Sequence, residues 1–67
     1  DLETLRVYLE QHLSATQAAR ELFIHRSTFL YRLDRIKEIL QSELDDPEEI
    51  FYLELSFRLL EQEQEKE

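Results

Sequence analysis

Apolar residues recur along this chain at the 3.6-residue spacing of an α-helix, with polar residues between them. The first stripe predicts a helix over residues 2–12, with Val7 off the stripe and apolar positions at Leu2, Leu5, Leu9 and Leu13. Another stripe predicts a longer helix over residues 26–41, whose buried positions are Phe29, Leu33, Ile36 and Leu40. The pattern therefore indicates amphipathic helices that each bury one face.

A short helix and a turn lie between these two stripes. Ser14 begins the sequence S-x-x-Q with Gln17, a capping-box spacing that predicts a helix over residues 15–22. Small residues on its inner side allow another helix backbone to approach closely: Ala15, Ala18 and Ala19. Apolar residues then interrupt the polar spacing at 23–25, which predicts a break before the next helix.

The fourth helix begins at a strong start signal. Asp46 stands at the N-cap, Pro47 at the first helical position and Glu49 at the third, so we predict a helix over residues 47–62. The charged segment 63–67 is expected to fray. This helix is apolar on two sides, with one stripe at Ile50, Leu53, Phe57 and Leu60 and the other at Phe51, Tyr52, Leu55 and Leu59.

The composition supports one small all-α domain. The chain has 67 residues with no glycine, no cysteine and one proline, which argues against tight hairpins, glycine-rich phosphate loops and disulfides. We therefore predict a single four-helix domain over residues 1–67. Because the chain starts at Asp1 and not at Met, we expect a fragment of a longer protein. No segment resembles a signal peptide or a membrane span, so we expect a cytoplasmic protein without membrane contact.

The charge is unevenly distributed along the chain. The net charge of −8 at first argues against DNA binding, since phosphate contacts require cations. Residues 38–67 carry −9, but residues 26–37 carry +3, with one acid, Asp34, against Arg26, Arg32, Arg35 and Lys37. Half of the lysine and arginine side chains thus lie in one twelve-residue stretch, within the third predicted helix.

A short helix, a turn and a second helix are the parts of a DNA-binding helix-turn-helix, whose second helix enters the major groove. Residues 15–33 supply these parts in order. Ala19 stands where the two helices would cross, and Leu22 and Ile24 bracket the turn and point inward. Phe29 and Leu33 anchor one side of the second helix in the core, so the opposite side of its first turn is expected to remain accessible.

Residues 14–36 read SATQAARELFIHRSTFLYRLDRI, and this segment resembles the C-terminal domain of PucR/CdaR-type regulators of purine catabolism and carbohydrate diacids. That family combines H-R-N-T, Y-R-L and a later L-D-D-P, and this chain has His25-Arg26-Ser27-Thr28, Tyr31-Arg32-Leu33 and Leu44-Asp45-Asp46-Pro47. The resemblance covers nearly the whole chain. The domain is also similar to the DNA-binding end of the factor for inversion stimulation. Phe23 stands where many helix-turn-helix proteins have glycine, which suggests a slightly different turn.

The resemblance implies a bacterial transcription regulator that binds double-stranded DNA, with an effector-sensing region upstream in the full-length protein. Arg26, at the start of the third helix, is the first candidate for base recognition, because arginine pairs bidentately with O6 and N7 of guanine. The other candidate DNA contacts are His25, Ser27, Thr28, Tyr31 and Arg35. Ser27 and Thr28 are also candidates to donate to phosphate, and His25 to cap the helix.

Three of the polar side chains on this helix allow two interpretations each. Tyr31 either contacts the groove or packs its ring against a neighbouring helix. Arg32 and Lys37 either reach phosphates or pair with carboxylates of the chain itself.

We expect neither enzymatic activity nor a cofactor nor a metal ion. Two histidines without cysteine and without H-x-x-x-H spacing make a poor zinc site. The many carboxylates fall on solvent faces, and no nucleophile or pocket-forming loop accompanies them.

The helix predicted over residues 47–62 needs two partners, because it is apolar on two sides. One interpretation packs both sides within the domain. The other, which we favour, is a homodimer interface at Phe51, Tyr52, Leu55 and Leu59, which would present two reading helices to a two-fold symmetric operator. The alternative function is a helical protein-interaction module that uses this helix and its acidic surface without nucleic acid.

Overall fold

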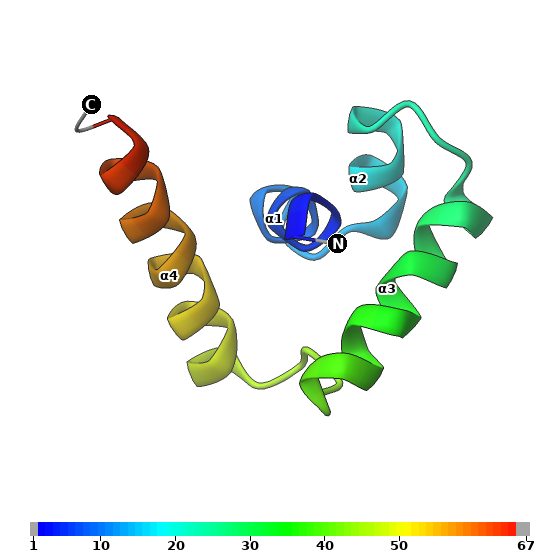
Figure 1. Cartoon of the computed structure of the whole chain (residues 1–67). Helices are drawn as coiled ribbons and strands as arrows, with labels where there is room; N and C mark the ends of the chain where they lie inside the picture. The colour runs from blue at the N-terminus through cyan, green and yellow to red at the C-terminus, as the bar shows by residue number, and fades with distance from the viewer. Residues whose placement is uncertain (1, 66–67) are drawn as a thin grey trace.

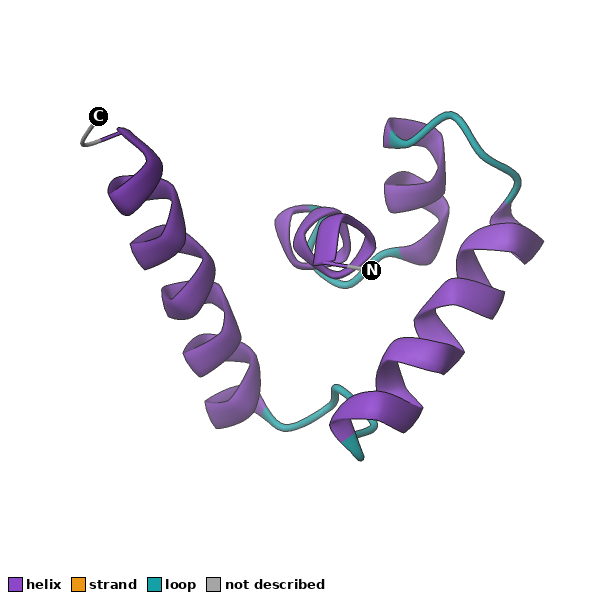
Figure 2. Ribbon diagram, viewed as in Figure 1, coloured by secondary structure: helices purple, strands orange, loops and turns teal. Residues whose placement is uncertain are grey.

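The computed structural model describes residues 2–65, and this part of the chain contains four α-helices and no strand (Figure 2). The helices are α1 (Leu2–Glu10), α2 (Ala15–Glu21), α3 (Arg26–Leu40) and α4 (Pro47–Glu65). Figure 1 shows α1 end-on in the centre, with α2 and α3 on one side and α4 on the other. The prediction of an all-α, four-helix domain is confirmed.

The core lies where α1, α2 and α3 meet. Phe29 of α3 is completely buried, and its ring centroid lies 5.8 Å from that of Tyr8 in α1. Ala18 and Ala19 of α2 are buried beside it, so small side chains allow α2 to approach its neighbours closely. The remaining buried apolar residues are Leu5, Val7, Leu9, Leu33, Ile36 and Leu44.

The buried face of α1 is wider than the sequence stripe predicted. Val7, expected off the stripe, is buried, as is Thr4. Leu2 and Leu13, expected on the stripe, are exposed. The reason is that α1 contacts α2, α3 and α4, so side chains on two of its sides are covered. Leu13 also lies beyond the end of the helix at Glu10, so the helical spacing does not apply to it.

Leu40 was predicted to be buried in the stripe of α3, and it is exposed. It is the last residue of α3, where the helix extends past the region that α1 covers. The other three members of the stripe, Phe29, Leu33 and Ile36, are buried as predicted.

The helices end without glycine. Five other residues take positive φ in the turns that follow α1, α2 and α3: His12, Leu13, Phe23, Gln41 and Leu44. After α2, Phe23 has φ 58°, its amide donates to the carbonyl of Arg20, and the amide of Ile24 donates to that of Ala19. This is the hydrogen-bond pattern of a Schellman motif, for which glycine is favoured. The slightly different turn expected at Phe23 is therefore wrong: the backbone takes the left-handed conformation with a phenylalanine in it.

Two of the predicted helix starts are capped by side chains. The Ser14 hydroxyl accepts a hydrogen bond from the backbone N–H of Gln17 at 3.2 Å, and Oδ1 of Asp46 accepts one from the backbone N–H of Glu48 at 3.2 Å. His25 occupies the N-cap position of α3, but its imidazole makes no capping hydrogen bond. The expectation that His25 caps this helix is wrong, because the side chain is exposed instead of turning back over the first turn.

The loop between α3 and α4 is held by Ser42 and Leu44. The Ser42 hydroxyl donates to Glu49 of α4 and accepts a hydrogen bond from the Leu44 amide at 2.9 Å, while the Leu44 side chain is buried in the core. These contacts place the beginning of α4 beside the end of α3. The helix continues to Glu65, beyond the predicted end at residue 62 and into the segment expected to fray; residues 66–67 lie outside the described part.

Candidate nucleic-acid interface

The α2–α3 pair has the layout of a helix-turn-helix. Ala18 and Ala19 are buried at the contact between the helices, and Leu22 and Ile24, half-buried on either side of Phe23, pack against the core. These apolar residues hold α2 against the underside of α3. The opposite side of α3 is consequently left without a helix covering it, as Figure 1 shows on the outer side of the molecule.

The accessible side of α3 carries the residues predicted to contact DNA. All six are exposed: His25, Arg26, Ser27, Thr28, Tyr31 and Arg35. They extend from the N-cap position along the first three turns of the helix. Their exposure follows from the stripe that anchors α3. Phe29, Leu33 and Ile36 are buried against the core, so the opposite side of the helix faces solvent.

Arg26 is held by a neutral partner. Its Nε donates a hydrogen bond to Oγ1 of Thr16, in the first turn of α2, at 3.2 Å. Neither Arg26 nor Arg35 has a carboxylate within the 4.0 Å of an ion pair among residues 2–65, whereas Arg6 on α1 lies 2.8 Å from Glu10. The positive charge of Arg26 is therefore accessible and is not cancelled by an acidic partner.

Arg35 and Tyr31 form a pair on the same face. Nη1 of Arg35 donates to the Tyr31 hydroxyl at 3.5 Å, and this hydrogen bond raises the pKa of Arg35 above its ordinary value. Tyr31 is 63% exposed, so the interpretation that its ring packs against a neighbouring helix is wrong. The ring instead stands beside Arg35 on the surface and can restrain its guanidinium.

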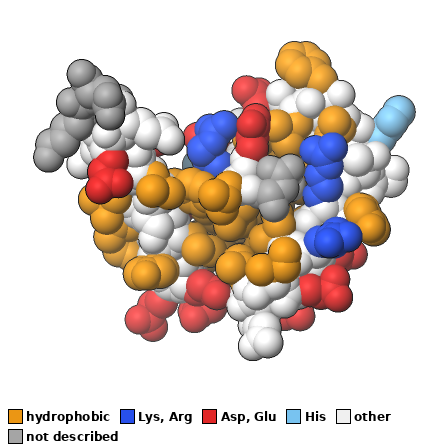
Figure 3. All heavy atoms as spheres, in the orientation of Figure 1, with side chains coloured by type: hydrophobic (Ala, Val, Ile, Leu, Met, Phe, Trp, Pro, Cys, Tyr) orange, Lys and Arg blue, Asp and Glu red, His pale blue; other side chains and the backbone are white. Residues whose placement is uncertain are grey.

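Basic and acidic side chains are interspersed on the face that Figure 3 shows. Basic groups lie on the α2 and α3 side and near the centre of the view, and acidic groups lie beneath them on the α3 side as well as along the lower edge toward α4. Among the basic residues, Arg20 of α2 is exposed, and Arg32 and Lys37 are half-buried at the edges of the α3 stripe. The exposed side of α3 thus presents Arg26 and Arg35 together with two exposed acids, Asp34 and Glu38.

Sequence reasoning missed Thr16. This residue lies ten positions before Arg26, and no periodic pattern joins them, because their contact depends on the angle at which α2 and α3 cross. The one available signal was its position at the beginning of the first helix of the motif, which lies near the beginning of the second in this fold.

A second surface lies on α4. The residues predicted as a dimer interface are exposed, at 67% for Phe51, 68% for Tyr52, 45% for Leu55 and 56% for Leu59. Ile50, Leu53 and Phe57, on the other side, are half-buried against the core, whereas Leu60, predicted in the same stripe, is exposed. Among the helices of residues 2–65, α4 contacts only α1, so the interpretation that both apolar sides pack within the domain is wrong.

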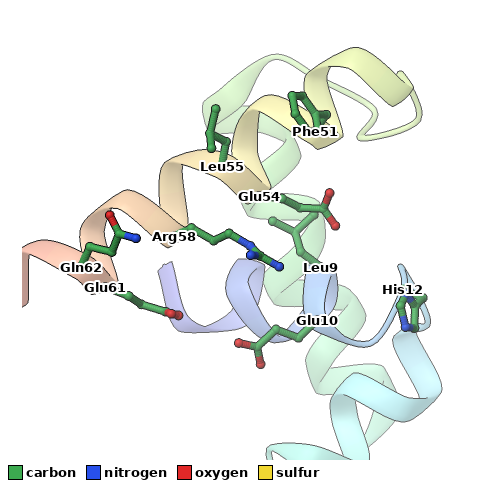
Figure 4. Close-up of a pocket in the computed structure, with 9 residues that line it drawn as sticks. All are labelled: Leu9, Glu10, His12, Phe51, Glu54, Leu55, Arg58, Glu61 and Gln62. Atoms are coloured by element: carbon green, nitrogen blue, oxygen red, sulfur yellow. The ribbon is translucent and has the colours of Figure 1, made fainter. Parts of the chain in front are cut away.

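A groove of about 730 Å³ runs between α1 and α4. Figure 4 shows Arg58 and Glu54 reaching from α4 toward Leu9 of α1, with Glu10 and Glu61 nearby. Within the described residues no group of three His, Cys, Asp or Glu side chains is arranged to hold a metal ion. None of the helices in this part of the chain has the length and apolar character needed to cross a membrane.

Residues 1–59 match the family described as the PucR C-terminal helix-turn-helix domain. The chain is 43% identical over 58 residues to the purine catabolism regulatory protein of Bacillus subtilis (strain 168), an alignment that covers 87% of this chain and 11% of that protein. It is 40% identical over 45 residues to the proline-responsive transcriptional activator PutR of the same organism, covering 67% of this chain and 11% of that protein. No solved structure matches.

Proposed function

Because this chain belongs to the family of PucR C-terminal helix-turn-helix domains, we propose that it binds DNA sequence-specifically by inserting the beginning of α3 into the major groove. The family makes it a DNA-binding domain of a transcription regulator. The chain spans 11% of the length of each of the two relatives, so we assign to a longer parent protein the effector-sensing region that the resemblance implied.

The observation that carries the proposal is the exposure of Arg26 and Arg35 on α3, where Glu38 acts on Arg35 only from beyond ion-pair distance. Sixteen acids outnumber eight lysines and arginines in the whole chain, yet neither arginine has a carboxylate within ion-pair distance among the described residues. Phosphate neutralisation supplies most of the affinity of DNA-binding proteins, and it requires cations that are not already paired. The acidic segment 38–67 would repel DNA, which favours approach from the α3 side.

Each exposed residue of this face has a proposed role. Arg26 reads guanine through its terminal nitrogens, and Arg35 lies nine residues, about two and a half turns, further along the same helix. Ser27 and Thr28 donate to phosphate oxygens at the start of α3. Tyr31 restrains Arg35 through the hydrogen bond between them, and His25 contacts the DNA backbone.

A titration at two salt concentrations tests DNA binding. Fluorescence anisotropy of a labelled duplex is measured with the chain at low and at moderate salt, and the affinity should be much lower at the higher salt concentration. Arg26→Ala should weaken binding by about 1–3 kcal/mol and relax the preference at one base pair. Arg58→Ala is the matched control, since it removes one exposed arginine from α4, on the other side of α1 from the start of α3 (Figure 1).

An affinity that is absent, or that salt does not change, would favour the alternative function of a protein-interaction module. The specific role of Arg26 is refuted if Arg26→Ala and Arg58→Ala reduce the affinity equally and leave the sequence preference unchanged.

We also propose that α4 joins two copies of the chain through Phe51, Tyr52, Leu55 and Leu59. The supporting observation is that these four residues are exposed, whereas Ile50, Leu53 and Phe57 of the same helix pack against the core. A two-fold pair would present two α3 helices to half-sites about 34–36 Å apart. Sedimentation equilibrium should show a dimer that Leu55→Glu dissociates.

The matched control for this dimer is Ile39→Glu, which places the same charge at an exposed apolar residue of α3. A wild-type chain that remains monomeric at high concentration would assign the α4 surface to another partner and refute the homodimer.

A further inference from the structure

We propose that Thr16 is a positioning residue for base recognition: its hydroxyl holds the Arg26 guanidinium in the orientation that reads DNA. Thr16 belongs to α2 and lies outside the set of residues predicted to contact bases. The inference rests on the proposed function, since it concerns how one residue of that interface is presented. It adds a specificity-determining residue from the first helix of the motif.

The geometry joins the two helices of the motif at one point. Thr16 is the second residue of α2 and Arg26 is the first residue of α3, and both side chains are exposed. The hydrogen bond from Arg26 Nε to Thr16 Oγ1, at 3.2 Å, spans ten residues of sequence. Because α2 is fixed by the buried Ala18 and Ala19, the backbone of Thr16 has a fixed position relative to the core.

The choice of nitrogen matters for recognition. A guanidinium has five N–H donors in a planar fork, and the bond to Thr16 uses the one on Nε. The four N–H groups on the two terminal nitrogens remain available. Arg26 is therefore presented end-on, so that both terminal nitrogens can face O6 and N7 of one guanine.

The chemistry of the acceptor matters as well. A carboxylate at this position would hold the guanidinium more tightly, but it would also cancel the charge and compete with guanine and phosphate. A hydroxyl is neutral, so the arginine keeps its full charge while part of its rotational freedom is removed before binding. Restraining one long side chain in advance is expected to strengthen binding to the preferred sequence by about threefold to tenfold.

The test compares Thr16→Val, which removes the hydroxyl and keeps the shape, with Thr16→Ser, which keeps the hydroxyl. The probe is a library of DNA duplexes with a randomised central segment, from which each variant of the chain selects bound sequences for sequencing. Arg26→Ala identifies the base pair that Arg26 reads. Ser56→Ala is the control for loss of a hydroxyl, since Ser56 lies on α4 and donates to the carbonyl of Tyr52 in its own helix.

We expect Thr16→Val to flatten the preference at the same base pair as Arg26→Ala and to weaken the best selected duplex by about threefold to tenfold. Its affinity for a duplex without that guanine, and the salt dependence of that affinity, should equal those of the wild type, because no charge is lost. Thr16→Ser should restore the preference, and Ser56→Ala should leave it unchanged.

The outcomes separate this inference from the proposed function. If the wild-type chain selects no sequence, the proposed function fails, and the role of Thr16 fails with it. If Arg26→Ala flattens one position and Thr16→Val does not, the inference alone is wrong. If Thr16→Val weakens binding to all duplexes equally without changing the base preference, Thr16 only contacts the DNA backbone, and its positioning role is refuted.

Discussion

Phe23→Gly is expected to stabilise the domain, although it removes the largest side chain of the helix-turn-helix turn. Phe23 has φ 58°, in the left-handed region, and its side chain is 94% exposed. The substitution therefore removes a conformational penalty without uncovering any packed surface. The two hydrogen bonds that close the turn use backbone atoms only, so they persist in the variant.

The magnitude follows from two opposing backbone effects. The left-handed conformation costs a residue with a Cβ roughly 1–2 kcal/mol, and glycine avoids this cost. Glycine also loses more conformational freedom on folding, and this lowers the free energy of unfolding by about 0.5–1 kcal/mol. The net gain in the free energy of unfolding is therefore about 0.5–1 kcal/mol, which corresponds to a rise of about 2–8 °C in the melting temperature of a domain this small.

The assay is urea and thermal unfolding followed by far-ultraviolet circular dichroism, with Phe23→Ala as the control. Alanine removes the aromatic ring but keeps the Cβ, so its free energy of unfolding should stay within about 0.5 kcal/mol of the wild type. A glycine variant that is no more stable than the alanine variant would refute the reasoning, because the penalty would then not reside in the backbone of the turn.

Three further predictions concern the core and the α3 face. Thr4 is 1% exposed and its hydroxyl has no hydrogen-bond partner among the described residues, so Thr4→Val should raise the urea midpoint, with a gain of about 1 kcal/mol. Phe29→Ala should cost about 3–5 kcal/mol, close to the whole stability of a domain this size, and circular dichroism should show that the cooperative transition is lost. Tyr31→Phe removes the acceptor that restrains Arg35, so it should weaken binding to a selected duplex by about fivefold at most, with an unchanged salt dependence in anisotropy titrations.

Much of the fold could be predicted from the sequence because helix signals are local. The caps at Ser14 and Asp46 act within three residues, and the buried stripe at Phe29, Leu33 and Ile36 repeats within a single helix. Such a stripe also determines which side of its helix is exposed. The accessibility of Arg26 and its neighbours therefore followed from the same pattern that identified the core.

The left-handed turn at Phe23 shows where local reasoning fails. A phenylalanine disfavours positive φ, and the sequence alone suggested a changed turn. The packing of Leu22 and Ile24 on either side requires the chain to reverse at that point, and the backbone takes the only conformation that closes the Schellman hydrogen bonds.

What the sequence by itself determined is the order of four helices, their starts and the accessible cationic side of α3, since each depends on residues a few positions apart. The tertiary structure decided the rest. It showed that α1 covers only one of the two apolar sides of α4, and it brought the Thr16 hydroxyl to Arg26 across ten residues. Both results depend on the relative placement of separate helices, which the packing of side chains from the whole chain sets and no local repeat encodes.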